Sequence, residues 1–352
     1  MRLAEAAEPT FARHETFHPR YGWFRKAYAF SARDPHTFTR EDAPVVIGVG
    51  KNMVRSIRFW GLAAKLVVED PMALNRRDPG VVPTELGHAL FGSDGWDPYM
   101  EDPGTLWLLH WLLLAPRSRL PVWWLAFNEF NAVEFSLQDL DDAVSTALKA
   151  TSEWEAPHPS SIKKDISALL RTYAPVERVG RMVLDDVLDC PMRELRLIGR
   201  SDATGAFRFA LGRKATLPPA VVAYAVLDYI ARTDATANTM TLGRLVQDPG
   251  TPGRAFRLNE REMHTALEEA CRDTRGLQLF APTGATQLTW KGDPGELAGR
   301  ILAKYFGRQP SGFCAGPRGD RPIDDDLLDE LGLGREPSDT MRRLLATSEV
   351  AV

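Results

Sequence analysis

Residues 48–66 read GVGKNMVRSIRFWGLAAKL, and this stretch carries the strongest signal for the fold of the chain. Plotted at about 100° per residue, one side of a helix collects apolar side chains: Met53, Ile57, Trp60 and Ala64. A second side, roughly 135° away, collects basic ones: Lys51, Arg55, Arg58 and Lys65. A helix that is packed by one face and cationic on another is how a recognition helix meets DNA phosphates. The alternative is a solvated basic face that binds no ligand.

The flanks of this helix favour a winged helix-turn-helix domain. Gly48-Val-Gly50 provides a tight turn between two helices, and Leu66-Val-Val68 is typical of the strand that follows a recognition helix. The segment TELGHALFG, residues 84–92, resembles the wing and closing helix of such domains. Turn, basic stripe and wing in this order indicate a nucleic-acid-binding module more strongly than a solvated face.

Length and composition are those of a soluble protein with several domains. The chain has 352 residues, of which 44% are hydrophobic and 26% are charged. Its formal net charge is −4, so any surface that binds DNA must be local. Between residues 11 and 60, basic residues do outnumber acidic ones.

Cysteine usage and apolar runs predict a cytoplasmic protein. Cys190, Cys271 and Cys314 are widely separated and form no CxxC pair, which argues against a zinc knuckle and a disulfide framework. The first ten residues contain no signal-peptide apolar run. The most apolar stretch, residues 106–115, has about half of the ~20 residues that a bilayer-spanning helix needs. We therefore expect a cytoplasmic location and no contact with a membrane.

Periodicity and helix breakers predict a mainly α fold in four parts. Residues 1–100 are expected to form the winged helix-turn-helix DNA-binding domain, and residues 101–155 an aromatic-rich helical extension with Trp and Leu side chains in its core. The polar segment before residue 160, which carries two prolines, marks a boundary. A second, winged-helix-like domain is expected at 156–308, and a partly mobile tail at 309–352.

The second winged-helix-like domain differs from the first in charge. Its helices are expected at 184–198, 218–231, 242–246 and 258–272, after a helix at 161–173, and a hairpin follows at 277–280 and 287–290. The helix before the hairpin carries glutamates that repel phosphate: Glu260, Glu262, Glu268 and Glu269. We expect this domain to be a protein-contact or spacer module.

Residues 14–18, His-Glu-Thr-Phe-His, match HExxH, in which two histidines hold zinc and the glutamate activates water. The context does not suit a zinc protease, because Pro19 follows at once and no third ligand stands out. Two interpretations remain open. The segment is either a packed helix entry, or His14 and Glu15 belong to a phosphodiester-cleaving site.

These two segments together predict a DNA site. The residues expected to bind DNA are Arg13, Lys51, Asn52, Arg55 and Arg58, with Asn52 able to read adenine edges. The residues expected to carry cleavage are His14, Glu15, Arg20 and Lys26. A His or Glu base would activate water, alone or with a divalent ion (Mg²⁺ or Mn²⁺), while the two cations stabilise the phosphorane charge. We identify no metal ligands and expect no organic cofactor.

A second polar cluster, DGWDPYMED, occupies residues 94–102. Carboxylates at such spacing hold Mg²⁺ in some proteins, but Asp102 directly precedes Pro103, the position of a helix cap. We expect capping. Gly48-Val-Gly50-Lys51 lacks the full GxxxxGK[ST] pattern of a phosphate loop, so that motif predicts no nucleotide site.

Three segments together resemble a bacterial family long catalogued only as a domain of unknown function. They are FARHETFHPRYGWFRKAY at 11–28, GVGKNMVRSIRFW at 48–60 and DPYMEDPGTLWLLHWLL at 97–113. The resemblance spans roughly residues 10–300. Members of that family look like the SspB-type component of single-strand DNA phosphorothioate modification, a restriction-modification system of antiviral defence.

This resemblance implies a DNA nickase, an endonuclease that opens one strand so that sulfur can enter the backbone. It also implies partners besides double-stranded DNA: a cysteine desulfurase, an ATP-pyrophosphatase-like sulfur-transfer subunit and an ATPase. A homodimer is one option for its own assembly. The alternative functions are a non-catalytic DNA-binding adaptor for the sulfur-transfer complex and a transcriptional regulator.

Overall fold

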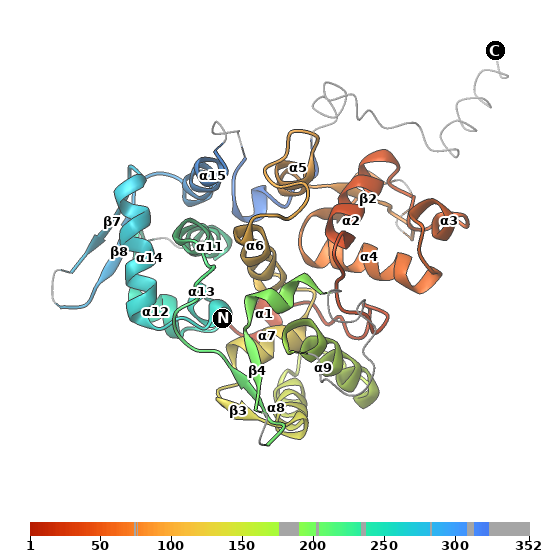
Figure 1. Ribbon diagram of the computed structural model, residues 1–352, viewed down its shortest axis with the longest axis horizontal. Coiled ribbons are helices and arrows are strands. Elements are labelled where there is room, and N and C mark those ends of the chain that lie inside the picture. Colours follow the sequence, from red (N-terminus) through yellow and green to blue (C-terminus); the bar gives the residue numbers. More distant parts are fainter. Residues whose placement is uncertain are drawn as a thin grey trace, which may run out of the picture.

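The structure is a computed structural model that describes residues 1–73, 75, 77–175, 190–201, 204–233, 237–281, 284–307 and 313–323 (Figure 1). Within these residues the fold is mainly α-helical, as the sequence predicts, with small antiparallel sheets. In Figure 1 one set of helices, around α2 and α4, lies on the opposite side of α6 from a second set, around α11 and α14. None of the described helices is both long and apolar enough to cross a membrane.

We call residues 23–91 the first helical unit. Its helices are α2 (Trp23–Arg33), α3 (Ala43–Ile47), α4 (Lys51–Ala63) and α5 (Glu85–Phe91). Between α4 and α5, the strands β1 (Val67–Glu69) and β2 (Val81–Pro83) pair antiparallel, with Val68 opposite Val82. Gly48 ends α3 with a φ of 73°, a left-handed conformation that glycine adopts without strain. The predicted turn, strand and closing helix are thus confirmed as elements.

Helices α2 and α4 cross closely because Gly61 has no side chain. A Cβ atom at Gly61 would lie 2.5 Å from the Cβ atom of Ala27. Of the predicted apolar stripe, Ile57 and Trp60 are 0% exposed and Met53 is partly buried, while Ala64, also 0% exposed, directly follows the helix. Because these side chains lock α4 against the rest of the protein, they also determine which side of the helix faces solvent.

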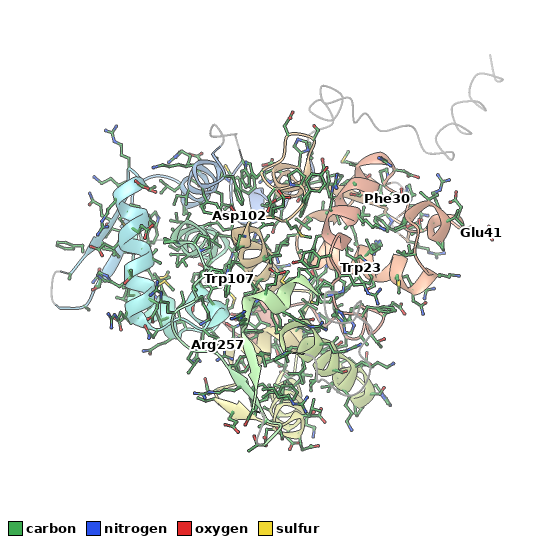
Figure 2. The ribbon with its side chains drawn as sticks, in the orientation of Figure 1. Trp23, Phe30, Glu41, Asp102, Trp107 and Arg257 are labelled. Carbon is green, nitrogen blue, oxygen red and sulfur yellow. The ribbon has the colours of Figure 1, made fainter. Side chains whose placement is uncertain are left out.

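The centre of the molecule is formed by α6 (Pro103–Leu114) and α7 (Pro121–Asn128). From Gly104 onward every residue of α6 is buried, so this helix has no solvated face. Trp107, labelled in Figure 2, donates its indole N–H to Thr216 Oγ1 at 3.0 Å. Trp111 donates to Asp228 Oδ2 at 2.7 Å. These tryptophans are therefore core side chains, as predicted, and not a stacking surface for bases.

The middle of the chain adds helices and a small sheet to this centre. The helices are α1 (Leu3–Ala6) at the N-terminus, α8 (Leu137–Ala150), α9 (Pro159–Tyr173) and the 3-10 helix η1 (Pro191–Leu195). The sheet has the order β3-β5-β4, with β3 (Glu134–Phe135), β4 (Ile198–Arg200) and β5 (Phe207–Phe209). Of the predicted helix over 184–198, residues 191–195 form the 3-10 helix η1, but it does not continue to 198 because Arg196 takes a φ of 50° and turns the chain into β4. The first part of that predicted helix lies outside the described residues.

We call residues 219–290 the second helical unit. It contains α11 (Pro219–Arg232), α12 (Leu242–Gln247), α13 (Pro252–Phe256) and α14 (Glu260–Asp273). Its sheet has the order β6-β8-β7, with β6 (Thr239–Thr241), β7 (Leu277–Phe280) and β8 (Gln287–Trp290). The hairpin has the bounds that the sequence predicts, whereas β6 and α13 are additional. Helix α15 (Pro294–Tyr305) follows and packs on α11.

Residues 313–323, which include the 3-10 helix η2 (Gly316–Arg318), join the two helical units. On one side η2 packs on α11. On the other side the backbone N–H groups of Glu85 and Leu86 donate to this segment, and Ile323 donates to the carbonyl of Pro83. This stretch of the predicted tail is therefore packed, and residues 324–352 lie outside the described part of the chain.

Candidate nucleic-acid interface

Helix α4 presents its first turns to solvent. Lys51, Asn52 and Arg55 are exposed, whereas Val54 and Ile57 are buried. The helix follows the extended residue Gly50 and has no side-chain cap. Since the N-terminal end of a helix carries partial positive charge, it adds to the attraction that the two cations exert on an anion.

Two of the four basic residues assigned to this face are engaged by other groups of the protein. Arg58 Nη2 lies 3.5 Å from Glu69 Oε1, and its side chain is 26% exposed. Lys65 is buried and donates to the backbone carbonyls of Leu112 and Ala115 at 2.7 and 3.0 Å. Because α4 ends at Ala63 and Lys65 takes a φ of 58°, helical periodicity does not extend to Lys65. The predicted position of Lys65 on the exposed basic face is wrong.

His14 is a buried residue that anchors the segment before α2. Its side chain is 1% exposed, and its ring centroid lies 6.3 Å from that of Trp60 and 5.8 Å from that of Trp123. Its Nε2 atom is hydrogen-bonded to Asp165 Oδ1 at 2.7 Å, and Ser56 Oγ donates to its carbonyl at 3.0 Å. A general base must reach the proton that it removes. We predicted that His14 lies beside a bound phosphate, but the structure places it in the core between Trp60 and Trp123.

Glu15 lies at the surface beside α4. Its Oε1 atom is 3.6 Å from Arg55 Nη1, and the two side chains are 32% and 56% exposed, respectively. Glu15 and Thr16 both have positive φ angles, 50° and 65°, so the chain reverses directly after His14. As a result, these two neighbouring residues differ in solvent exposure. His14 is enclosed by protein, and the Glu15 carboxylate lies next to the exposed Arg55.

The other predicted residues have mixed surroundings. Arg13 is exposed. The Arg20 guanidinium lies 5.7 Å from the ring centroid of Trp23, a cation–π contact. Lys26 Nζ donates to the carbonyl of Ile47 at 3.0 Å and thereby ties α2 to the end of α3. Lys26 thus has a structural contact that supports the turn before α4.

Two arginines from a distant part of the sequence add positive charge near residues 16–18. Arg171 on α9 donates to the carbonyl of Thr16, and Arg193 Nε donates to the carbonyl of Arg171 at 3.0 Å. Burial, and then the positive charges of Arg193, Arg171 and Arg20, lower the pKa of His18 to about 3. The smaller, electrostatic part of this shift comes from guanidinium groups on three chain segments near one imidazole. Sequence reasoning missed Arg171 and Arg193, since no local pattern reports a contact across 155 residues.

The acidic cluster at 94–102 serves as a helix cap, as predicted. Asp102 Oδ1 accepts the N–H of Gly104 at 2.7 Å, at the start of α6. Asp97 accepts two backbone N–H groups and the hydroxyl of Thr105. In the part of the chain that the structure describes, no group of three or more His, Cys, Asp or Glu side chains is arranged to hold a metal ion. These residues therefore do not offer a ready divalent-metal site, and the metal stays a prediction.

Comparisons with known proteins point to one family. A family model described as a protein of unknown function, DUF4007, matches residues 11–306. A crystal structure of SspB is similar at 39% identity and a TM-score of 0.81, covering 87% of this chain and 91% of that chain. A crystal structure of magnesium ion-bound SspB has the same identity and TM-score and covers 87% and 90%. No curated protein sequence matches this chain. The resemblance inferred from the three motifs is thus confirmed, and the chain belongs to the DUF4007 family and is of the SspB type.

Proposed function

We propose that this protein is the DNA-binding component of a DNA phosphorothioate modification system that acts in antiviral defence. The first helical unit serves as a winged helix-turn-helix, and α4 enters a groove of double-stranded DNA. The observation that carries this proposal is the exposed, cationic start of α4, with Lys51 and Arg55, on a helix locked in place by Ile57 and Trp60. The likeness to SspB supports the assignment to phosphorothioation.

Phosphate contacts extend beyond α4 in this proposal. We define the basic surface as Arg13, Lys51, Arg55, Arg171 and Arg193. Arg171 reaches the loop that carries Glu15, and Glu15 contacts Arg55, so the three chain segments form one continuous region. Asn52, which is exposed beside Lys51, reads base edges. Arg58 contributes less, because Glu69 already lies beside it.

Salt dependence of DNA affinity tests this proposal. Fluorescence anisotropy with a labelled duplex gives log Kd at several NaCl concentrations for the wild type and for a Lys51→Gln/Arg55→Gln variant. The loss of two phosphate contacts should lower the slope of log Kd against log salt by about 2. Arg272→Gln is the matched control, because Arg272 is also exposed on a helix and paired with a glutamate, Glu268, at 3.2 Å. An unchanged slope in the double variant would refute a role for α4.

Strand nicking is the second part of the proposal, and Glu15 is the residue that supports it. This carboxylate lies 3.6 Å from Arg55, where a phosphate bound by the basic surface would be held. Glu15 accepts a proton from the attacking water, directly or through a divalent ion, while a P–O bond of the backbone breaks and solvent protonates the leaving oxygen. Arg20 stabilises the added negative charge on phosphorus. We assign no proton transfer to His14, because it is enclosed.

Supercoiled plasmid with Mg²⁺ or Mn²⁺ tests nicking. Open-circle product should form with the wild type and fall at least about 100-fold with Glu15→Gln, the range of a lost general base. The reaction is run with the purified protein alone and with the sulfur-transfer subunit, ATPase and cysteine desulfurase of the same system. If none of these mixtures yields open circles, the non-catalytic adaptor is the function. If the protein binds a promoter and changes its expression in cells that lack those partners, the function is that of a transcriptional regulator.

A further inference from the structure

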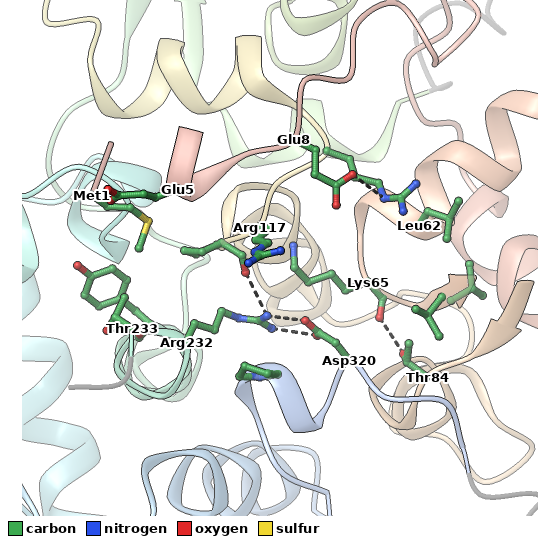
Figure 3. Close-up of a pocket in the computed structure, with 16 residues that line it drawn as sticks. Met1, Glu5, Glu8, Leu62, Lys65, Thr84, Arg117, Arg232, Thr233 and Asp320 are labelled. Atoms are coloured by element: carbon green, nitrogen blue, oxygen red, sulfur yellow. Dashed lines mark hydrogen bonds and ion pairs between the residues drawn. The ribbon is translucent and has the colours of Figure 1, made fainter. Parts of the chain in front are cut away.

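A large pocket separates the two helical units (Figure 3). Its volume is about 780 Å³, within the range of pockets that hold small molecules. Leu62, Lys65 and Val67 line it from the end of α4 and from β1, and Tyr229 and Arg232 line it from α11. The N-terminal segment, the loop between α6 and α7 and the segment that carries η2 complete the walls.

The carboxylates of this pocket are already paired. Asp320 receives two hydrogen bonds from the guanidinium of Arg232, as Figure 3 shows. Glu8 Oε2 lies 3.4 Å from Arg119 Nε. Glu5, at the rim, accepts a hydrogen bond from Arg2 Nε at 2.8 Å. These carboxylates thus form their ion pairs with arginines, although the charges of Asp320 and Glu8 also act on Lys65 and raise its pKa.

Two cations of the lining, Lys65 and Arg117, form no direct ion pair with a carboxylate in the described part of the chain. Lys65 uses two of its three ammonium protons on the carbonyls of Leu112 and Ala115. Arg117, labelled in Figure 3, lines the same pocket and is exposed. Burial lowers the pKa of Lys65 to about 8, so it still carries its proton at neutral pH. A buried cation whose direct partners are only carbonyl groups gains from an anion in direct contact, which makes the pocket a favourable place for one.

We propose that this pocket binds a small phosphate-bearing molecule, with the phosphate between Lys65 and Arg117 and the organic part against Leu62, Val67 and Tyr229. A phosphate accepts hydrogen bonds from several donors at once, so it satisfies the third ammonium proton of Lys65 and the guanidinium of Arg117. The apolar walls provide contact area for a ring or sugar. Because the walls come from both helical units, a bound ligand stabilises their arrangement.

Thermal unfolding and calorimetry test this proposal on the full chain. The probes are inorganic phosphate, AMP and ATP, each compared with NaCl at equal ionic strength. At least one probe should raise the Tm by about 2–4 °C at saturation, because it binds the folded state alone. The same probe should bind about 10-fold more weakly to Arg117→Gln, the loss of one charge-assisted hydrogen bond, and near wild-type strength to Arg117→Lys. Arg272→Gln, on the far side of the second unit, should leave its Kd unchanged.

Several results would overturn the proposal. One is that no probe shifts the Tm, and another is that Arg117→Gln leaves the Kd of the binding probe unchanged. Lys65→Met is measured as well, but Arg117→Gln carries the test because an exposed arginine can be replaced without unfolding the protein. Duplex affinity is recorded in parallel. If Arg117→Gln weakens DNA binding while no small probe binds, the pocket lies on the DNA path, and the small-molecule site is refuted independently of α4.

Discussion

The first and second helical units have similar elements and opposite surfaces. In both, a helix with a buried apolar stripe precedes a two-stranded hairpin: Ile57 and Trp60 anchor α4, and Met263 and Leu267 anchor α14. The exposed residues of α4 include Lys51 and Arg55. By contrast, α14 has four glutamates among its 14 residues. The hydrophobic stripe therefore builds the element, and the charge of the opposite face determines which ligand it attracts.

This contrast supports different roles for the two units. We propose that the second unit contacts a protein partner of the modification system, since α14 repels phosphate and Phe280 on the neighbouring β7 is 59% exposed. The salt bridge between Glu268 and Arg272 on α14 stays at the surface and contributes little to stability. In the same proposal, the first unit binds DNA.

The largest expected effect concerns the centre that both units share. Trp111→Ala removes a fully buried indole and leaves Asp228 Oδ2 without one hydrogen bond, so we expect a loss of roughly 3–5 kcal/mol in the free energy of unfolding. Urea unfolding measures this loss. The exposed Phe280 is the control, and Phe280→Ala should change stability by less than about 0.5 kcal/mol. Equal effects of the two substitutions would contradict a common core.

Acid should destabilise the attachment of the second unit. His110 on α6 is bonded to the Tyr173 hydroxyl and to the carbonyl of Ala255 in α13, and burial lowers its pKa to about 4. Above pH 6.5 this histidine is neutral in both the folded and unfolded states. As the pH falls toward 4, only the unfolded state takes up the proton, so up to about 3 kcal/mol of stability is lost.

Unfolding midpoints between pH 7.5 and 4.5 measure this dependence. His110→Gln keeps a hydrogen-bonding side chain without a titrating group, so its stability should fall less steeply in this range. His18 contributes in the same direction in both proteins, since its pKa is lowered to about 3. Parallel pH curves for wild type and variant would show that His110 titrates alike in both states.

A smaller effect is specific to the first unit. A methyl group at Gly61 would lie 2.5 Å from Cβ of Ala27, so Gly61→Ala must push α2 away from α4. We expect a cost of about 1–3 kcal/mol and faster hydrogen exchange in α2. Gly243→Ala in the second unit is the matched control, because nothing lies within 4 Å of the added methyl group. Gly61→Ala with wild-type stability would mean that the two helices separate without cost.

The smallest expected effect tests the difference in charge between α4 and α14 directly. Helices α4 and α14 each have a solvent-accessible Glu–Arg pair, Glu15 with Arg55 at α4 and Glu268 with Arg272 on α14. Glu15→Gln removes a negative charge from the basic surface, so duplex affinity should rise about 2–5-fold at low salt, the equivalent of a pair worth less than about 1 kcal/mol. Glu268→Gln should leave that affinity unchanged. Equal gains would mean that net charge, and not α4, sets DNA affinity.

Local features of the chain were predictable where local physics produces them. The stripe of α4, the left-handed turn at Gly48, the cap at Asp102 and the hairpin bounds all follow from periodicity, glycine conformation and capping, which involve residues a few positions apart. The same holds for Lys51, Asn52 and Arg55, since an exposed face is the complement of an apolar stripe. Their role in DNA binding remains a prediction.

Contacts between distant segments depended on the tertiary structure. The HExxH pattern places His14 and Glu15 side by side in sequence, but two left-handed residues and Asp165 on α9 enclose the histidine and expose the glutamate. Lys65 continues the basic pattern of α4, yet it is buried against carbonyls at the end of α6. Side-chain periodicity extends only as far as the helix, and which segments pack together depends on the whole core. The composition and local patterns of this chain therefore determined its helices and its basic face, while packing over long sequence distances determined which charges reach solvent and which line the pocket.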